Sequence, residues 1–197
     1  MPRIVLASRN KHKIAELRFF LTGLPFEVVS LDDFSDMPLL IEDGTTFKEN
    51  ALKKAIQVYQ KTKTLTLADD SGLEVFFLNG RPGVYSARYA GTNASDDENN
   101  QKLLSELRGV AARRRGAQFR AVLALVGKNT ERTTEGICPG AIAESPRGTN
   151  GFGYDPIFIP KDFTRTYAEL VSEEKNTISH RSRAFEKMRV ILRTEIH

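Results

Sequence analysis

Two adjacent carboxylates, Asp69 and Asp70, lie between two apolar, strand-like runs at 65–68 and 73–78. Acidic groups beside buried strands are costly unless they are paired or bind a metal ion. Successive side chains of an extended segment point to opposite sides, so we expect the two aspartates to have different roles. One would bind Mg²⁺ and activate water, the usual use of carboxylates beside phosphates. The alternative is an Asx-type turn that caps its own backbone.

A polar loop that includes Ser8, Asn10, Lys11 and Lys13 follows the apolar run 4–7 and opens a predicted helix. Hydroxyl and amide groups donate to phosphate oxygens, and lysine adds positive charge. The first turn of a helix also presents N–H groups to anions. The glycine pattern of a P-loop is absent. The alternative is an ordinary helix with Asn10 as its N-cap and exposed lysines.

Charged residues also surround a second predicted helix at 47–61. Glu42 and Asp43 precede its start, where the helix dipole favours acids. Glu49 follows Thr46 at the spacing of a capping box. The apolar stripe of this helix has four members, which are Phe47, Ala51, Ala55 and Tyr59. Lys54 lies at the edge of the stripe, whereas Lys53 lies opposite it, where it would form a surface pair with Glu49.

Two further segments carry candidate ligand-binding groups. In 151–156, glycines flank Phe152 and Tyr154, so the backbone can approach a planar ligand on which a ring stacks. The alternative is a loop whose aromatic residues fill the core. Lys175, His180 and Arg181 then place three donors close to the start of the last helix. Cations oppose the dipole at a helix start, which favours binding of an anion or a carbonyl-rich base over a merely solvated helix end.

The composition of the 197-residue chain is that of a globular protein with one domain or two lobes. No apolar run approaches the roughly 20 residues of a membrane span, and the N-terminal apolar run is too short for a signal peptide. One cysteine, Cys138, excludes an internal disulfide and a cysteine-rich zinc site. The net charge of +4 weakly favours an anionic partner. Part of this excess is Arg113–Arg115, which we expect to be a solvated run.

The elements that must position these residues are a mixture of strands and helices that do not strictly alternate. Strands are predicted at 4–7, 26–30, 65–68 and 73–78, and a long hairpin at 118–127 and 131–143. Helices are predicted after Asn10, at 47–61, from Ser95 or Asp96 to about residue 107, and at the C-terminal end. Phe185, Met188 and Leu192 share one face of the last helix. The pattern indicates an α/β protein with a mixed sheet.

Six segments, taken in order, resemble the inosine/xanthosine triphosphate pyrophosphatase family. They are Ser8-x-Asn10-x-x-Lys13, Phe47-x-Glu49-Asn50-Ala51-x-x-Lys54, Ala68-Asp69-Asp70-Ser71-Gly72-Leu73, Pro82-Gly83-Val84-Tyr85-Ser86-Ala87-Arg88-Tyr89, Gly151-Phe152-Gly153-Tyr154-Asp155-Pro156 and Glu174-Lys175-x-x-x-Ser179-His180-Arg181. The resemblance implies an α/β, elongated two-lobed fold around a long, mixed, twisted β-sheet flanked by helices. It also implies one domain over 1–197 with the active-site cleft between its lobes, and a homodimer. A cytoplasmic location is expected from the single cysteine and the short N-terminal apolar run.

The same resemblance implies Mg²⁺-dependent hydrolysis of the deaminated purine nucleotides ITP, dITP and XTP to the monophosphate and pyrophosphate. Asp70 would be the metal-linked base and Asp69 would support it. The implied substrate-binding residues are Ser8, Arg9, Asn10, Lys11, His12, Lys13, Lys54, Ser71, Phe152, Gly153, Tyr154, Asp155, Lys175, His180 and Arg181. The first six would cradle the triphosphate, and residues 152–155 would form the wall of the base pocket. No nucleic acid or membrane partner is implied.

The chain departs from the family pattern at two places. Ile41 stands where many relatives have an acid, so Glu42 becomes the expected second metal ligand, with Glu49 as the alternative. Ser8-Arg9-Asn10 stands where relatives often have Thr-Gly-Asn.

Selectivity would rest on donors, either backbone N–H groups or His180 or Arg181, that face the 6-oxo group and reject adenine. Three other functions stay open. They are a pyrophosphatase for modified pyrimidine or ordinary nucleotides, a basic nucleic-acid-binding module, and a nucleotide-binding regulator without turnover.

Overall fold

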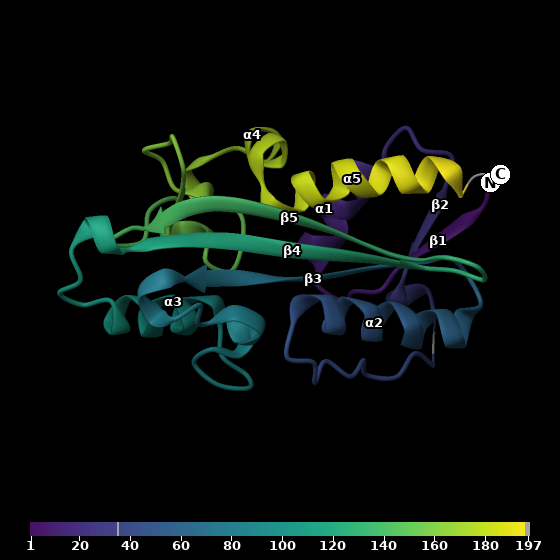
Figure 1. Ribbon diagram of the computed structural model, residues 1–197, viewed down its shortest axis with the longest axis horizontal. Coiled ribbons are helices and arrows are strands. Elements are labelled where there is room, and N and C mark those ends of the chain that lie inside the picture. The colour runs from purple at the N-terminus through teal and green to yellow at the C-terminus, as the bar shows by residue number, and fades with distance from the viewer. Residues whose placement is uncertain (35, 196–197) are drawn as a thin grey trace. The chain divides into compact units, whose positions relative to one another are not determined.

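The computed structural model describes residues 1–34 and 36–195 (Figure 1). Its strands are β1 (Arg3–Leu6), β2 (Glu27–Ser30), β3 (Thr66–Val75), β4 (Gly116–Val126), β5 (Glu131–Ile142) and β6 (Phe158–Pro160). Its α-helices are α1 (Lys11–Leu21), α2 (Phe47–Thr62), α3 (Asp96–Glu106), α4 (Ser172–Ile178) and α5 (His180–Thr194). These elements confirm the predicted α/β class. None of the described helices is long and apolar enough to cross a membrane.

The strands form one mixed sheet in the order β2-β1-β3-β4-β5-β6. β1 runs parallel to β2 and to β3, whereas β6 runs antiparallel to β5. The helix-containing connections from β1 to β2 and from β2 to β3 are what parallel neighbours require. The predicted mixed sheet is therefore confirmed.

Contacts divide the chain into two compact units. The first contains Met1–Asp70, Ala121–Gly136 and the chain from Arg181 onward, and the second contains Ser71–Arg120 and Ile137–His180. Each of β3, β4 and β5 passes from one unit into the other. Two of these divisions separate consecutive candidate residues, Asp70 from Ser71 and His180 from Arg181.

In the first unit α1 and α5 pack together against the sheet, and α2 lies on the opposite face (Figure 1). The rings of Phe20 and Phe185 stack with centroids 5.4 Å apart. Phe185, Met188 and Leu192 are buried, as the periodicity of the last helix predicts. Asn10 caps α1, because its side-chain oxygen accepts hydrogen bonds from the amides of His12 and Lys13. This local cap fixes where the helix begins.

In the second unit a core of aliphatic and aromatic residues forms around Phe119, Phe158 and Tyr167. Leu103 and Leu107 tie α3 to this core, and both are fully buried. Cys138 is buried in the same cluster and behaves as the small apolar residue that its β-prone surroundings predict.

Two sequence-based predictions are wrong in detail, and one strand was not predicted. Residues 69–72 do not separate two strands but lie inside β3, so the alternative of a turn is also wrong. Residues 76–78 form a 3-10 helix rather than the end of a strand, and β6 was not predicted. Cations explain the first difference. Lys13, Lys54 and Arg181 pair with the two aspartates, so burying these carboxylates within a strand does not leave them uncompensated.

The arginine run is also not uniformly solvated. Arg113 and Arg114 are exposed, but Arg115 is buried and donates to three backbone oxygens, those of Leu107, Ile142 and Ala143. A guanidinium carries five N–H donors in a planar array, which suits several carbonyl groups at once. Arg115 therefore joins the end of α3 to the end of β5.

Candidate active site

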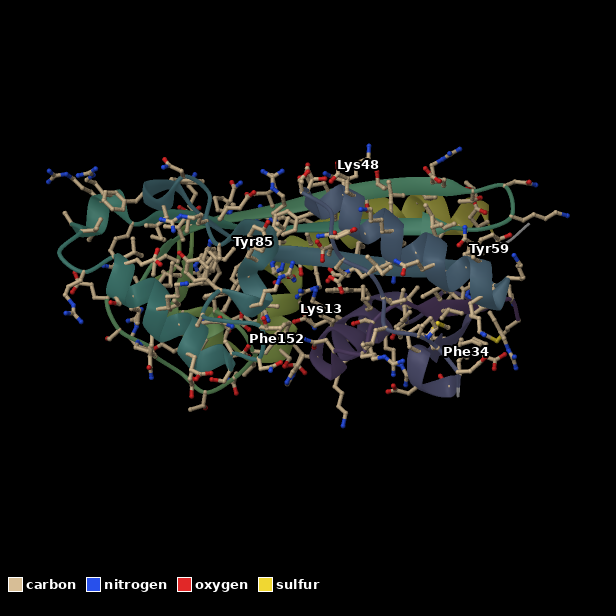
Figure 2. All side chains as sticks on the ribbon, turned by 90° about the horizontal axis from the view of Figure 1, so that it is seen from below. Lys13, Phe34, Lys48, Tyr59, Tyr85 and Phe152 are labelled. Atoms are coloured by element: carbon tan, nitrogen blue, oxygen red, sulfur yellow. The ribbon has the colours of Figure 1, made fainter. Side chains whose placement is uncertain are left out.

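Asp69 is the buried centre of an ionic cluster in the first unit. Its Oδ1 lies 2.7 Å from Nζ of Lys13 on α1, and its Oδ2 accepts from Nε of Arg181 on α5 at 3.1 Å. Burial alone would raise the pKa of this carboxyl, but Arg181 and Lys13 outweigh burial and hold the pKa well below its usual range. Asp69 is thus ionised and ties two helices to β3. Figure 2 labels Lys13.

Asp70 has a different partner, as alternation along an extended strand predicts. Its Oδ1 accepts from Nζ of Lys54 on α2 at 2.8 Å. Burial raises the pKa of the Asp70 carboxyl above its usual value, against the opposing effect of Lys54 and Lys13. Two neighbouring carboxyls therefore have pKa values shifted in opposite directions, because Asp69 faces two cations that outweigh its burial and Asp70 does not.

Lys54 joins Asp70 to Glu42. Its Nζ lies 3.2 Å from Oε2 of Glu42, and its side chain is almost fully buried. Burial lowers the pKa of the Lys54 ammonium, but Asp70 and Glu42 outweigh burial, so the pKa is raised. The two residues expected to bind the metal ion thus converge on one positive charge.

Burial and opposing charge also act on Lys13. Burial lowers the pKa of the Lys13 ammonium, and the nearby Asp69 only partly offsets this effect.

Arg181 reaches a second carboxylate, since its Nη1 donates to Oε2 of Glu16 at 2.7 Å. Glu16, which the sequence analysis did not single out, is therefore part of the same cluster. Its position one helical turn after Lys13 was the available signal.

The segment 41–45 is attached to α2 by a ladder of side-chain hydrogen bonds. Gln57 pairs with both the N–H and the C=O of Ile41, at 3.0 and 3.1 Å. The successive rungs are Glu42 to Lys54, Asp43 to Lys53, Gly44 to Asn50 and Thr45 to Glu49. The helix partners are spaced by three or four residues or are adjacent, so they share one side of α2. The ladder fixes the backbone that carries Glu42.

This ladder changes two expectations. Lys53 pairs with Asp43, at 2.6 Å, in place of the surface pair expected with Glu49. Glu49 instead accepts from the N–H and hydroxyl of Thr45, so the alternative metal ligand is occupied as a helix-start acceptor. Thr46 caps the amide of Glu49, as the capping-box spacing predicts. Of Glu42 and Glu49, the two candidates for the second metal ligand, only Glu42 has its carboxylate beside Lys54, the partner of Asp70.

The predicted phosphate loop is held mainly by its own polar groups. Oγ of Ser8 accepts from the amide of Asn10. Arg9 reaches toward the next loop, where it donates to the backbone oxygen of Met37 at 2.9 Å. Lys11 and His12 are exposed at the start of α1. The helix cap is therefore formed as the alternative reading expected, while binding of phosphate by this loop stays a prediction.

In the second unit, Asp155 organises the loop 151–155. Its Oδ2 accepts from Nζ of Lys175 at 2.7 Å and from the amide of Phe152 at 3.0 Å. Nζ of Lys175 also lies 4.9 Å from the centroid of the Phe152 ring, which Figure 2 labels. Gly151 has φ of +76°, and a Cβ atom there would lie 2.0 Å from the Asp155 carboxylate. The carboxylate thus determines the shape of the loop.

The other aromatic residue of this loop is buried. Tyr154 donates from its hydroxyl to the backbone oxygen of Ser86 at 2.8 Å, and burial raises its pKa. The Ser86 hydroxyl accepts from the amide of Leu73 and donates to the backbone oxygen of Gly83. His180 stacks on Phe119, with centroids 4.7 Å apart. Tyr154 therefore packs in the core, as the alternative reading expected, whereas Phe152 is the less buried aromatic side chain.

The predicted residues thus form two groups, one in each unit. Lys13, Lys54, Asp69, Asp70, Arg181 and Glu42 form the first, and Phe152, Tyr154, Asp155 and Lys175 belong to the second. Within the described ranges no group of three or more His, Cys, Asp or Glu side chains has the arrangement of a complete metal site. Two carboxylates do fit Mg²⁺, which commonly retains water and binds substrate phosphates in addition to one or two acids.

An α/β fold with ionised acids and lysines along a strand and two helices defines a class of protein suited to binding anionic substrates. The family model that matches residues 4–191 is described as the Ham1 family. The chain belongs to this family. The resemblance inferred from the six sequence segments is confirmed at the level of the family.

Curated relatives match over nearly the whole chain. The chain is 54% identical over 185 residues to a protein of Geobacter sulfurreducens named dITP/XTP pyrophosphatase, and the match covers 93% of each sequence. It is 47% identical to a protein of the same name from Bacillus licheniformis, over 98% of each sequence. A solved HAM1 protein from Coxiella burnetii is 44% identical, with a TM-score of 0.90, and the match covers 98% of this chain and 100% of that one.

Proposed function

We propose that this protein is a nucleoside-triphosphate pyrophosphatase that removes deaminated purine nucleotides, namely ITP, dITP and XTP, by forming the monophosphate and pyrophosphate. The names of the relatives support this reaction. The observation that carries the proposal is the convergence of Asp70 and Glu42 on Lys54. It brings a buried acid, Asp70, and a more exposed acid, Glu42, to one buried cation, which supplies the charges that phosphoryl chemistry uses for neutralisation and for activating water.

Asp70 is the proposed general base. Without a bound metal ion, burial raises the pKa of this carboxyl, and Lys54 fixes the direction of the carboxylate. A buried carboxylate held in one direction suits acceptance of a proton from a bound water. The water proton passes to a carboxylate oxygen of Asp70 as the water oxygen attacks the α-phosphorus. The bond from that phosphorus to the oxygen that bridges it to the β-phosphorus breaks, and pyrophosphate leaves with that oxygen. Asp69 remains ionised throughout because Arg181 and Lys13 keep its pKa low. Asp69 therefore holds the strand and the two helices in place rather than accepting a proton.

Asp70 and Glu42 are the residues that would hold Mg²⁺, which when bound supplies positive charge to the phosphate oxygens and lowers the pKa of water. The ladder along α2 supports this assignment because it fixes the backbone on both sides of Glu42. Ser8, Asn10 and Lys11 are the proposed phosphate donors at the start of α1. The residues that would recognise the base are Phe152, Asp155 and Lys175. The family resemblance adds His180 to them.

The decisive experiment measures release of pyrophosphate and monophosphate from ITP, dITP, XTP, GTP and ATP with Mg²⁺. We expect release from the first three, and a loss of about 10²-fold or more in Asp70→Asn. Glu42→Gln should raise the Mg²⁺ concentration needed for half-maximal rate, whereas Asp43→Asn, the adjacent exposed acid, should not. Binding of ITP without release of pyrophosphate would instead indicate a nucleotide-binding regulator.

We also propose that the protein is a homodimer, on the basis of the family resemblance. Light scattering after size-exclusion chromatography tests this directly. A mass close to that of one 22.1 kDa chain over the working concentration range would contradict it.

A further inference from the structure

Helix α3 holds the loop 151–155 through the backbone of a single residue, Gly153. Oδ2 of Asp96 accepts from the Gly153 amide at 2.6 Å, and Nδ2 of Asn100 donates to the Gly153 carbonyl at 2.9 Å. Asp96 and Asn100 are four residues apart and lie on one side of α3. Both polar groups of one peptide residue are therefore occupied by one helix.

The position of Gly153 explains why these two bonds matter. Gly153 has φ of +62°, and a Cβ atom built there would have no neighbour within 4 Å. Steric contact at the Cβ position therefore does not restrict this residue, and the bonds from α3 add to those of Asp155, which close the loop on either side of it. Gly153 separates Phe152, which lies over the Lys175 ammonium, from Tyr154, which is tied to Ser86. The angles at Gly153 therefore set how the Phe152 ring is presented.

Asn100 is retained at an energetic cost. Its side chain is 3% exposed, and its Oδ1 is buried with no hydrogen-bond partner among the residues that the structure describes. An unsatisfied buried acceptor costs roughly 1–3 kcal/mol, whereas an apolar residue of similar size would avoid this cost. The amide therefore contributes through its other end, the bond to Gly153.

Helix α3 is also attached to a second segment, residues 89–90. Asn99 accepts from the amide of Ala90 at 2.8 Å. Lys102 donates to the Tyr89 carbonyl at 2.6 Å, and Glu106 accepts from the Tyr89 hydroxyl at 2.6 Å. Together with the buried side chain of Leu103, these bonds attach α3 to residues 89–90 and to the core of the second unit.

We propose that Asp96 and Asn100 are positioning residues for base selection, acting through Gly153 on the orientation of Phe152. This inference rests on the proposed function, because it assigns the loop to the purine base. Asp96 and Asn100 are not expected to touch the reacting phosphates. Loss of either bond should therefore weaken discrimination between a 6-oxo and a 6-amino purine more than it slows hydrolysis.

The test compares wild type with Asp96→Ala and Asn100→Leu. Removing one hydrogen bond should raise KM for ITP by about three- to tenfold, with kcat changed by less than about twofold, and should lower the ITP-over-ATP ratio of kcat/KM. Asp96→Asn, which keeps an acceptor for the Gly153 amide, should restore most of the ratio. Asp97→Ala is the matched control, since Asp97 is exposed in the same helical turn.

Two nucleotide arms separate this inference from the proposed function. Failure of the wild type to release pyrophosphate would reject the proposed function alone. The binding of IDP and ADP, measured by titration calorimetry, tests the positioning role without turnover. A lower IDP-over-ADP preference in Asp96→Ala and Asn100→Leu, together with faster deuterium exchange at the Gly153 amide, supports it. An unchanged preference in both variants, or an equal loss for both nucleotides, overturns it.

Discussion

The two groups of candidate residues are held by different physical means. In the first unit, Asp69, Asp70 and Lys54 are buried and fixed by opposite charges from a strand and helices. In the second unit, the loop around Gly153 is fixed by hydrogen bonds to its backbone, and the carboxylates of Asp96 and Asp155 accept two of them. Buried charges give strong but costly positioning, whereas backbone hydrogen bonds define a conformation with little net charge.

This difference matches the two chemical tasks of the proposed function. A site that neutralises phosphates must contain permanent charge, and that charge must be balanced before the substrate arrives. A site that distinguishes similar bases needs groups at defined angles, which a glycine loop attached to a helix supplies. Lys175 and Asp155 combine the two strategies, because an ion pair there also holds the amide of Phe152. The comparison leads to four predictions.

The largest effect is expected in the first unit. Asp69→Asn removes the charge that faces Lys13 and Arg181, so the free energy of unfolding should fall by about 3–5 kcal/mol. Urea denaturation followed by circular dichroism measures this loss. Glu27→Gln, which breaks an ion pair between exposed side chains of Arg3 and Glu27, is the control and should change little. Equal losses in the two variants would show that buried charge does not dominate in this unit.

The loop of the second unit should respond according to steric contact. Gly151→Ala places Cβ against the Asp155 carboxylate and should cost about 2–4 kcal/mol, with a raised KM. Gly153→Ala meets no atom within 4 Å and should cost only about 1–2 kcal/mol for its positive φ. Thermal unfolding and nucleotide kinetics compare the pair. A larger effect at Gly153 would mean that Asp155 does not determine the loop.

A neutral contact in the first unit should matter less than its charges. Gln57→Leu removes the bonds to Ile41 and should lower the free energy of unfolding by about 1–2 kcal/mol. Deuterium exchange of the Ile41 amide should accelerate at the same time. Gln60→Leu is the control, because Gln60 is an exposed glutamine of the same helix. Unchanged exchange in Gln57→Leu would contradict a fixed ladder.

The smallest effect is a pH dependence at the start of α3. The amide and hydroxyl of Ser95 lower the pKa of the Glu98 carboxyl. A lowered folded-state pKa stabilises the fold above the unfolded-state pKa, and this contribution is lost as the pH falls through the folded-state value. Glu98→Gln should therefore be less stable than wild type at pH 7, and the difference should vanish below about pH 3. Melting temperatures at both pH values measure it, and a constant difference would exclude this origin.

Much of the fold follows from local sequence patterns. The cap at Asn10, the helix from Phe47 and the buried face of the last helix are each determined by residues within a few positions of one another. β3 is different, because Asp69 and Asp70 favour a turn when considered alone. They remain in a strand because Arg181, distant in the sequence, and Lys13 and Lys54 balance their charges.

The types of the candidate site residues were also predictable, but their partners were not. The sequence indicates that Lys13, Lys54 and the acidic pair belong together, without saying which lysine faces which acid. Asp96 and Asn100 carry no motif and resemble an ordinary solvated helix face. Their partner Gly153 is 53 residues from Asn100, so no local pattern reveals the contact. Arg115 was misjudged for the same reason, since distant carbonyl groups rather than neighbouring arginines decide its burial.

The ladder along α2 also has a consequence for the order in which the chain folds. Its rungs join residues separated by 4, 6, 10, 12 and 16 positions. Each contact therefore encloses the previous one, and each new rung adds only a few residues to a loop that is already closed. Since the entropy cost of closure grows slowly with loop length, residues 41–57 can assemble stepwise from the helix start outward. The backbone of Glu42 thus depends on contacts within residues 41–57 rather than on the long-range pairing of strands.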